Sequence, residues 1–140
     1  MTTTHLCARM SRIRVLLADD HQTVQARVRS ILCKGFEVVG TVNNGRDAVA
    51  EVRRLDPDIL VIDISMPVLD GLQAASQLRG IACRTKVVFL TVHEDQDYVD
   101  AAFVTRASGY VTKSNITSDL VLAIREALTG HTYVSKSMNT

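Results

Sequence analysis

Two apolar runs in this chain lead directly into aspartates, and these carboxylates are the first residues whose position suggests chemistry. Residues 59–62 run into Asp63, and residues 13–18 run into the pair Asp19 and Asp20. Apolar runs of this kind are typical of strands covered on both faces of a parallel sheet. Open α/β sheets bind ligands at the carboxyl ends of such strands. Taken alone, Asp63 fits a turn cap equally well, because Asp is a common turn residue.

Thr91 and Lys113 end two further strand-like runs and favour a chemical interpretation of Asp63. Three carboxylates gathered at one sheet edge repel one another unless a cation lies among them. Aspartate oxygens with open positions suit Mg²⁺, which takes about six oxygen ligands and keeps some water. A hydroxyl and an ammonium beside such a site are what the oxygens of a transferring phosphoryl group require. Because Asp is also a covalent acceptor in aspartyl-phosphate chemistry, Asp19, Asp20, Asp63, Thr91 and Lys113 together predict a site that carries a phosphoryl group.

Strands and helices must alternate along the chain to bring these residues together. Apolar runs rich in β-branched residues predict five strands, over residues 13–18, 37–42, 59–62, 86–91 and 108–112. Apolar residues at helical spacing predict a first helix that carries Val24, Val28, Ile31 and Leu32 and that Gly35 closes as a C-cap. Further helices are predicted over about 46–55, 72–78 and 95–105, and a last one over 116–128 with Thr117 or Ser118 near its N-cap and Gly130 after it.

This alternation indicates an α/β fold with a parallel sheet and helices on both faces. Among doubly wound folds, the flavodoxin-like (CheY-like) five-stranded order 2-1-3-4-5 fits the number of elements. That order places the first and third strands side by side, so we expect Asp19, Asp20 and Asp63 to converge.

The composition fits one globular domain. The 140 residues are 46% hydrophobic and 22% charged, with a net charge of +1, and the cations form no basic stripe of the kind that a nucleic-acid surface needs. Cys7, Cys33 and Cys83 are odd in number and widely spaced, which predicts reduced thiols. No apolar run reaches membrane-spanning length, and residues 1–10 lack the apolar segment of a signal peptide. We therefore expect a cytoplasmic protein with no membrane partner.

The joint pattern resembles the receiver domain of two-component response regulators, over residues 13–130. The resemblance is carried by Asp19-Asp20, by Asp63 before Met66-Pro67 and Asp70-Gly71, by Thr91, and by Gly109-Tyr110 leading to Lys113. Each of these features is common alone, and their order at successive strand ends makes the pattern specific.

The resemblance implies a role for each site residue. Asp63 would be phosphorylated by a histidine kinase, a phosphotransfer protein or a small phosphodonor, with Lys113 and Thr91 serving the phosphoryl group. Asp20, Asp63 and the backbone carbonyl of Ser65 would bind Mg²⁺, and Asp19 would act largely through a metal-bound water. Thr91 and Tyr110 resemble the switch pair, in which the hydroxyl moves toward the phosphoryl group and the aromatic ring turns inward. Such a chain catalyses only its own phosphorylation and slow dephosphorylation, so we do not expect an enzyme with outside substrates.

The two ends of the chain are expected to lie outside the receiver domain, which we assign to residues 11–130. Residues 1–10 are predicted to form a disordered extension. Residues 130–135 resemble the segment that leads to a helix-turn-helix domain in NarL/FixJ-type regulators, so 131–140 is predicted to start a linker to an output domain absent from this chain. DNA contact would then require that output domain. A stand-alone receiver is the alternative, and a homodimer is compatible with either.

Two positions, Ser114 and Val92, depart from the commonest receiver residues. Ser114 stands where many receivers have proline, and a cis Lys113–Ser114 bond would cost roughly 3 to 4 kcal/mol. Val92 is larger than the usual small residue, and we expect it to restrict the access of water to the site. His93, two residues after Thr91, is a candidate modulator at the mouth of the site, whereas His5, His21 and His131 receive no role.

Two other functions on this fold fit the residues less well. A phosphohydrolase of the haloacid dehalogenase type needs a second Asp two residues after its nucleophile, where this chain has Ser65. A nucleotide or flavin binder needs a Gly-rich loop after the first strand, where Asp19, Asp20 and His21 stand instead. Turnover of a chromogenic phosphoester would support the first alternative, and one acid-labile phosphate per chain would support the receiver.

Overall fold

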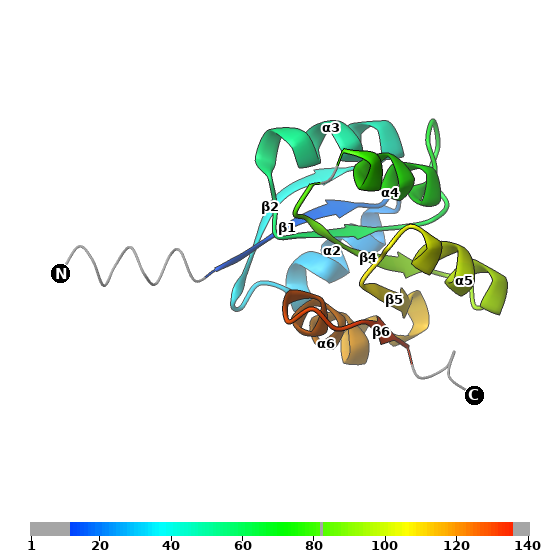
Figure 1. Cartoon of the computed structure of the whole chain (residues 1–140). Helices are drawn as coiled ribbons and strands as arrows, with labels where there is room; N and C mark the ends of the chain where they lie inside the picture. Colours follow the sequence, from blue (N-terminus) through cyan, green and yellow to red (C-terminus); the bar gives the residue numbers. More distant parts are fainter. Residues whose placement is uncertain (1–11, 82, 136–140) are drawn as a thin grey trace.

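The computed structural model describes residues 12–81 and 83–135, which form a parallel sheet between two layers of helices (Figure 1). The strand order is β2-β1-β3-β4-β5-β6. The strands are β1 (Ile13–Ala18), β2 (Phe36–Val42), β3 (Ile59–Ile62), β4 (Lys86–Thr91), β5 (Gly109–Thr112) and β6 (Tyr133–Val134). The helices are α2 (Gln22–Ile31), α3 (Gly45–Leu55), α4 (Gly71–Gly80), α5 (Gln96–Val104) and α6 (Ile116–Leu128). The predicted fold class and the order 2-1-3-4-5 are confirmed.

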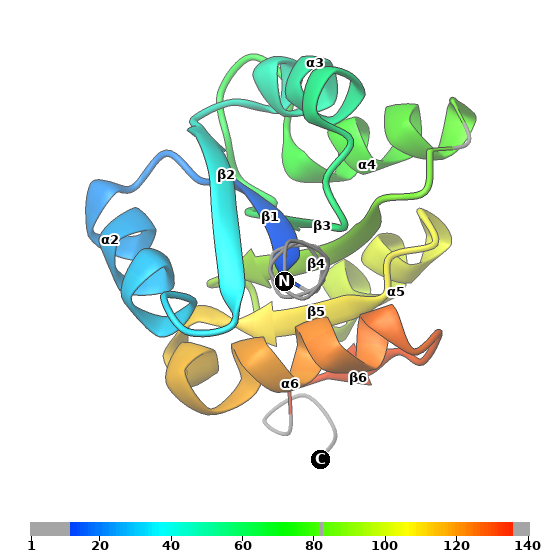
Figure 2. The same cartoon turned by 90° about the vertical axis from the view of Figure 1, so that its left-hand side faces the viewer.

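The helices divide between the two faces of the sheet, with α3, α4 and α5 on one face and α2 and α6 on the other (Figure 2). Strand β3 contributes to both cores, because Leu60 and Ile62 pack toward the first set of helices and Ile59 and Val61 toward the second. All four side chains are fully buried. This two-sided burial explains why the run before Asp63 contains no polar residue.

Three local expectations are corrected by the structure. Gly35 does not cap α2, which ends at Ile31 with Leu32 as its C-cap; Gly35, with φ +85°, lies in the turn toward β2. The N-cap of α6 is Asn115 rather than Thr117 or Ser118, because a 3₁₀ turn over Lys113–Asn115 continues directly into the helix. The sheet has a sixth strand, β6, which adds to the free edge of β5 within the segment predicted as a linker.

The extension predicted over residues 1–10 lies outside the described residues, as do Cys7 and residues 136–140. The boundaries at residues 11 and 130 therefore remain predictions. Gly130, with φ +84°, follows the end of α6 as expected. Cys33 and Cys83 are free thiols.

Two glycines fix the loop between β3 and α4, which carries the residues after Asp63. A Cβ atom on Gly71 would lie 2.1 Å from the carbonyl oxygen of Asp63, and one on Gly45 would lie 2.1 Å from that of Leu69. Their N–H groups donate to the carbonyl oxygens of Ile64 (2.7 Å) and Leu69 (2.9 Å). Only glycine allows these close backbone approaches, which hold the loop against the end of β3.

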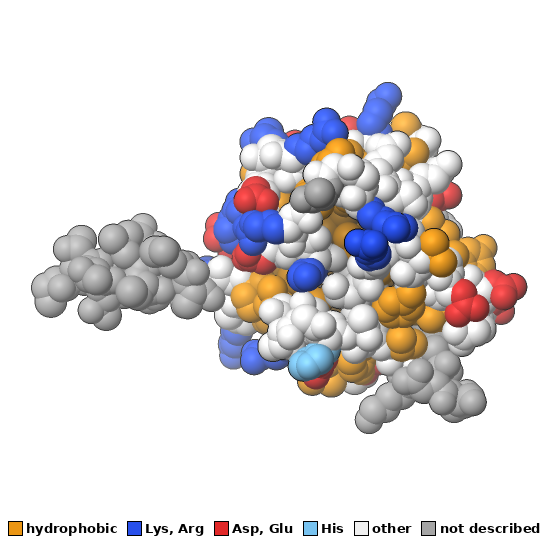
Figure 3. All heavy atoms as spheres, in the orientation of Figure 1, with side chains coloured by type: hydrophobic (Ala, Val, Ile, Leu, Met, Phe, Trp, Pro, Cys, Tyr) orange, Lys and Arg blue, Asp and Glu red, His pale blue; other side chains and the backbone are white. Residues whose placement is uncertain are grey.

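The surface carries mixed charge over the described residues. Figure 3 shows Lys and Arg side chains in separate groups on one face, with acidic side chains gathered near α5. No helix in the described ranges is both long and apolar enough to pass through a bilayer.

Candidate functional site

Four strand ends bring polar side chains to one point of the sheet edge. Asp19 follows β1, Asp63 follows β3, Thr91 ends β4 and Lys113 follows β5. The ammonium nitrogen Nζ of Lys113 lies 2.9 Å from Oδ2 of Asp19 and 3.0 Å from Oδ2 of Asp63. The convergence expected from the strand order is therefore present, with the lysine between two of the carboxylates.

Burial separates the roles of the three aspartates. The side chains of Asp19 and Asp63 are 1% and 3% exposed, and that of Lys113 is 11% exposed. Asp20 is 34% exposed and lies at the open side of the site. Buried charges persist in a fold when they are paired and hydrogen-bonded. Lys113 supplies that pairing for Asp19 and Asp63, while Asp20 faces solvent.

The electrostatics of the site favour the arrival of positive charge. Burial raises the pKa of Asp63, the negative charge of Asp19 raises it further, and the hydrogen bond and charge of Lys113 offset only part of this rise. Burial alone would lower the pKa of Lys113, but hydrogen bonding and the negative charges of Asp19 and Asp63 together outweigh burial, so the pKa of Lys113 is raised. Lys113 is thus a fixed cation, and the carboxylates retain unneutralised negative charge.

His21 joins this cluster, and sequence reasoning missed it. Its ring nitrogen Nδ1 lies 3.2 Å from Asp19, 3.3 Å from Asp20 and 4.0 Å from Asp63, measured to the nearest carboxylate oxygens. Its backbone N–H donates to Oδ1 of Asp19 (2.8 Å), which fixes the turn between β1 and α2. The available signal was its position directly after the Asp19-Asp20 pair.

The donor set suits a hard divalent cation. One ligand atom from each of Asp19, Asp20, His21 and Asp63 can be chosen so that all four lie within 4.8 Å of one another. Carboxylate oxygens are the ligands that Mg²⁺ prefers, and the exposed side of Asp20 leaves room for water or phosphate oxygens. The residues therefore fit a magnesium site. Ser65 lies in the adjoining loop, where its N–H donates to Oδ1 of Asp63 (3.3 Å), and its carbonyl remains a predicted ligand.

Thr91 and Tyr110, the predicted switch pair, are both buried. Oγ1 of Thr91 accepts a hydrogen bond from the N–H of His93 (3.2 Å). The ring of Tyr110 is turned inward, and its hydroxyl donates to the backbone carbonyl of His93 (2.8 Å). Burial raises the pKa of Tyr110, and nearby acidic side chains, Asp63 among them, raise it further. The segment after β4 is thus bonded to both members of the pair.

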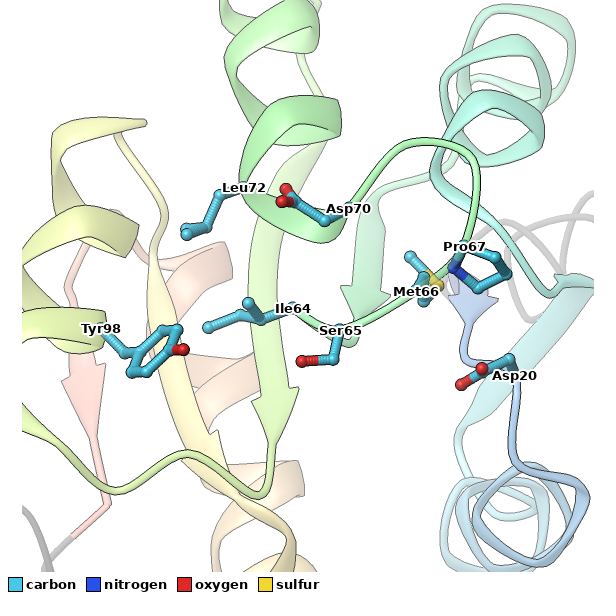
Figure 4. A pocket seen from close by; sticks show the side chains of 8 residues that line it. All are labelled: Asp20, Ile64, Ser65, Met66, Pro67, Asp70, Leu72 and Tyr98. Carbon is cyan, nitrogen blue, oxygen red and sulfur yellow. The ribbon is translucent and has the colours of Figure 1, made fainter.

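His93 lies at the mouth of the site, as the sequence predicted, although its modulating role remains a prediction. Its Nε2 is 2.6 Å from the hydroxyl of Ser65, and its ring stacks on Tyr98 at a centroid distance of 4.0 Å. Figure 4 shows the adjoining pocket of about 390 Å³, with Asp20 and Ser65 on strand-end loops and Tyr98 on α5 across from them. Of the three clustered carboxylates, Asp20 lines this pocket.

Ser114 and Val92, which differ from the commonest receiver residues, lie just after the ends of β5 and β4. The Lys113–Ser114 bond is trans, since residues 12–81 and 83–135 contain no cis peptide. The hydroxyl of Ser114 donates to Oε2 of Glu94 (3.3 Å). Val92 is 64% exposed beside Thr91, and its predicted effect on water access remains a prediction.

Comparisons with known proteins agree with this geometry. Residues 15–125 match the family model of the response regulator receiver domain. Over 128 residues the chain is 35% identical to the response regulator UvrY of Escherichia coli K12, covering 90% of this chain and 59% of UvrY. A two-component response regulator of the LuxR family from Aurantimonas is 31% identical, with a TM-score of 0.87 over 92% of this chain and 94% of that one. The receiver domain of the putative response regulator NarL from Mycobacterium tuberculosis is 27% identical, with a TM-score of 0.82 over 86% of this chain and 99% of that one.

Proposed function

The chain belongs to the response regulator receiver domain family, and on that premise we propose that it is a phosphoacceptor module in which Asp63 carries the phosphoryl group. The observation that supports this assignment most strongly is the contact between Lys113 Nζ and both Asp19 and Asp63 at the convergent strand ends. A histidine kinase, a phosphotransfer protein or a small acyl phosphate is the proposed donor.

The proposed reaction is transfer to a carboxylate. An oxygen of the ionised Asp63 side chain attacks the phosphorus atom of the donor, and a new O–P bond forms as the donor–phosphorus bond breaks. The leaving group departs with the electron pair of that bond: a neutral imidazole from a phosphohistidine whose other ring nitrogen carries a proton, or a carboxylate from an acyl phosphate. No proton is removed from Asp63, so the reaction requires the ionised form of the acid whose pKa burial raises.

The residues around Asp63 stabilise the transferred group by position and charge. The ammonium group of Lys113 pairs with the Asp63 carboxylate before transfer and with the phosphoryl oxygens after it. Thr91, at the end of β4, donates a hydrogen bond to a phosphoryl oxygen. Asp19, Asp20, Asp63 and the carbonyl of Ser65 are the proposed holders of Mg²⁺. When bound, that ion supplies the positive charge that the phosphoryl oxygens require.

Regulation is proposed to pass through β4 and β5. The hydroxyl oxygen of Thr91 accepts a hydrogen bond from the N–H of His93, and the carbonyl oxygen of His93 accepts one from the hydroxyl of Tyr110. A phosphoryl group that attracts the Thr91 hydroxyl competes with the first of these bonds. The segment that begins α5 would therefore shift with phosphorylation. The chain spans 59% of the length of UvrY. The proposal also includes a DNA-binding output domain outside this chain, a homodimer and a cytoplasmic location. A receiver that acts alone through protein contacts is the alternative.

The experiment is labelling with radioactive acetyl phosphate in the presence of Mg²⁺. We expect one acid-labile phosphate per wild-type chain, none with Asp63→Asn, and full labelling with Asp97→Asn, which makes the same change at an exposed position on α5. Chelation of Mg²⁺ should stop the reaction. Labelling of Asp63→Asn, or turnover of a chromogenic phosphoester, would count against the proposal and favour a different acceptor or a phosphohydrolase.

A further inference from the structure

The described chain ends on the outer edge of β5, the strand that leads to Lys113. After α6, residues Tyr133–Val134 pair with β5 in parallel, with Gly109 opposite Tyr133 and Tyr110 opposite Val134. The N–H of Tyr133 donates to the carbonyl oxygen of Ser108 (2.9 Å). Val134 packs against the core cluster that contains Tyr110. Figure 1 shows β6 at this edge of the sheet, beside α6.

Ser135 makes two hydrogen bonds to β5 at the residues that flank Val111. Its N–H donates to the carbonyl oxygen of Tyr110 (2.9 Å), and its hydroxyl oxygen accepts the N–H of Thr112 (3.0 Å). Ser135 is fully buried, as are Tyr110 and Thr112. Because Ser135 is buried and bonds β5 through both its backbone and its hydroxyl, it fixes the position of the segment against β5.

Thr112 is the last residue of β5, and Lys113 follows it directly. The hydroxyl of Thr112 accepts a hydrogen bond from the side chain of Asn115 (2.9 Å) and lies 3.3 Å from the hydroxyl of Ser114. The 3₁₀ turn that begins at Lys113 is therefore held on one side by these contacts and on the other by the contacts of Lys113 with Asp19 and Asp63. The hydrogen bond from the N–H of Thr112 to Ser135 therefore helps to fix the backbone next to Lys113.

We propose that Ser135 is a positioning residue for Lys113, and that docking of residues 133–135 on β5 is coupled to the occupation of Asp63 by a phosphoryl group. The inference rests on the proposed function. Ser135 contacts neither the phosphodonor nor Asp63, and its hydroxyl acts through the N–H of Thr112. Residues 133–135 are thereby linked, through the bond between Ser135 and Thr112, to Lys113.

The coupling has a defined direction. If docking holds Lys113 in the position that contacts phosphoryl oxygens, a group that binds Lys113 in that position must strengthen docking by the same factor, because linked equilibria are reciprocal. Phosphorylation is therefore expected to tighten the contact of residues 133–135 with β5. Loss of the Ser135 hydroxyl should weaken both docking and phosphoryl transfer.

The first test compares phosphorylation kinetics of wild-type protein, Ser135→Ala, Ser135→Thr and Ser30→Ala, with acetyl phosphate as donor. Ser30 is an exposed serine on α2 and gives the matched control. We expect the maximal rate of Ser135→Ala to fall about tenfold, equivalent to about 1.4 kcal/mol, because without its bond to Ser135 Thr112 no longer holds the adjoining Lys113 in place, at a cost of about one buried hydrogen bond. The Mg²⁺ concentration for half-maximal rate should not change, and Ser135→Thr, which restores a hydroxyl, should recover most of the rate. A purely structural role would lower thermal stability and leave the maximal rate unchanged.

The second test measures amide hydrogen exchange of Thr112 and Ser135, with and without beryllofluoride and Mg²⁺. In wild-type and Ser30→Ala proteins the phosphoryl mimic should slow both amides about tenfold, and in Ser135→Ala the effect on Thr112 should disappear. Two results would overturn this inference and leave the proposed function standing. One is a wild-type phosphorylation rate for Ser135→Ala with normal labelling of Asp63. The other is an amide exchange rate that does not change when beryllofluoride binds. Failure of wild-type protein to label or to bind the mimic would overturn the proposed function and this inference with it.

Discussion

Replacing Lys113 with methionine tests whether this lysine neutralises a buried acidic pair. Methionine keeps the unbranched side chain up to its last heavy atom and removes the charge. The two contacts, at 2.9 and 3.0 Å, correspond to about 6 kcal/mol of attraction each at an effective dielectric constant of about 20. Most of this is offset by the cost of burying three charges, several kcal/mol per ion, so removal of one partner from such a cluster costs about 3 kcal/mol.

The stability lost in Lys113→Met is expected to depend on pH. Without Lys113, the folded-state pKa of Asp63, already raised by burial, rises further above its value in the unfolded chain. An acid whose folded pKa is raised destabilises the fold fully at pH values above that pKa, and the penalty declines as the pH falls through the folded pKa and disappears below the unfolded pKa. The loss of stability should therefore be largest near neutral pH and should shrink on acidification. In the parent protein the raised pKa of Lys113 predicts the reverse, a stabilising contribution that is complete below the unfolded pKa and is lost as the pH rises through the folded value.

The assay is urea unfolding at neutral and mildly acidic pH, with Lys86→Met as the matched control. Lys86 is exposed at the start of β4, so its replacement should change the free energy of unfolding by less than about 0.5 kcal/mol. A loss below about 1 kcal/mol for Lys113→Met, or a loss that does not depend on pH, would refute the reasoning that the lysine holds the two carboxylates in place.

Three further substitutions test separate features of the site. Asp63→Asn should raise the midpoint of thermal unfolding near neutral pH, because it removes a buried acid whose pKa is raised, and the gain should fade as the pH is lowered; a constant gain would contradict this cause. Val68→Gly should stabilise the fold by about 1 kcal/mol in urea unfolding, because Val68 has φ +70° and is 69% exposed, so strain is relieved and no packing is lost; an unchanged or lower stability would show that the loop holds no such strain. Gly71→Ala should prevent native folding, seen as a lost near-ultraviolet circular dichroism signal, since its Cβ would lie 2.1 Å from the carbonyl oxygen of Asp63; a native spectrum would mean that the loop can move away from β3.

Much of the site was predictable because its residues follow apolar runs with an unambiguous pattern. The bounds of β1, β3 and β4 match the predicted ranges, and Asp19, Asp63, Thr91 and Lys113 follow or end strands whose burial dictates their composition. The convergence of these residues then follows from the strand order, which the alternation and number of the elements predict.

The features that escaped prediction depend on contacts between distant segments. Strand β6 has two residues and owes its position to backbone pairing with β5, so no periodic pattern marks it. Ser135 is buried by the same pairing. The place of His21 among the carboxylates depends on the geometry of the turn after β1, and the positive φ of Val68 is imposed by the tightly held loop around it. For β6, Ser135 and Val68 the local sequence carries no pattern that predicts these contacts, and for His21 the only local signal is its position directly after the Asp19-Asp20 pair.

The most direct test of the central claim is to locate the phosphoryl group chemically. Wild-type protein is treated with acetyl phosphate and Mg²⁺, the acyl phosphate is reduced with borohydride, and the chain is digested and sequenced by mass spectrometry. Reduction converts a phosphorylated aspartate into homoserine and leaves unmodified carboxylates intact. We predict homoserine at position 63 and at no other aspartate. Homoserine at Asp19, Asp20 or another acid, or its complete absence from a protein that was labelled, would contradict the assignment of Asp63 as the acceptor.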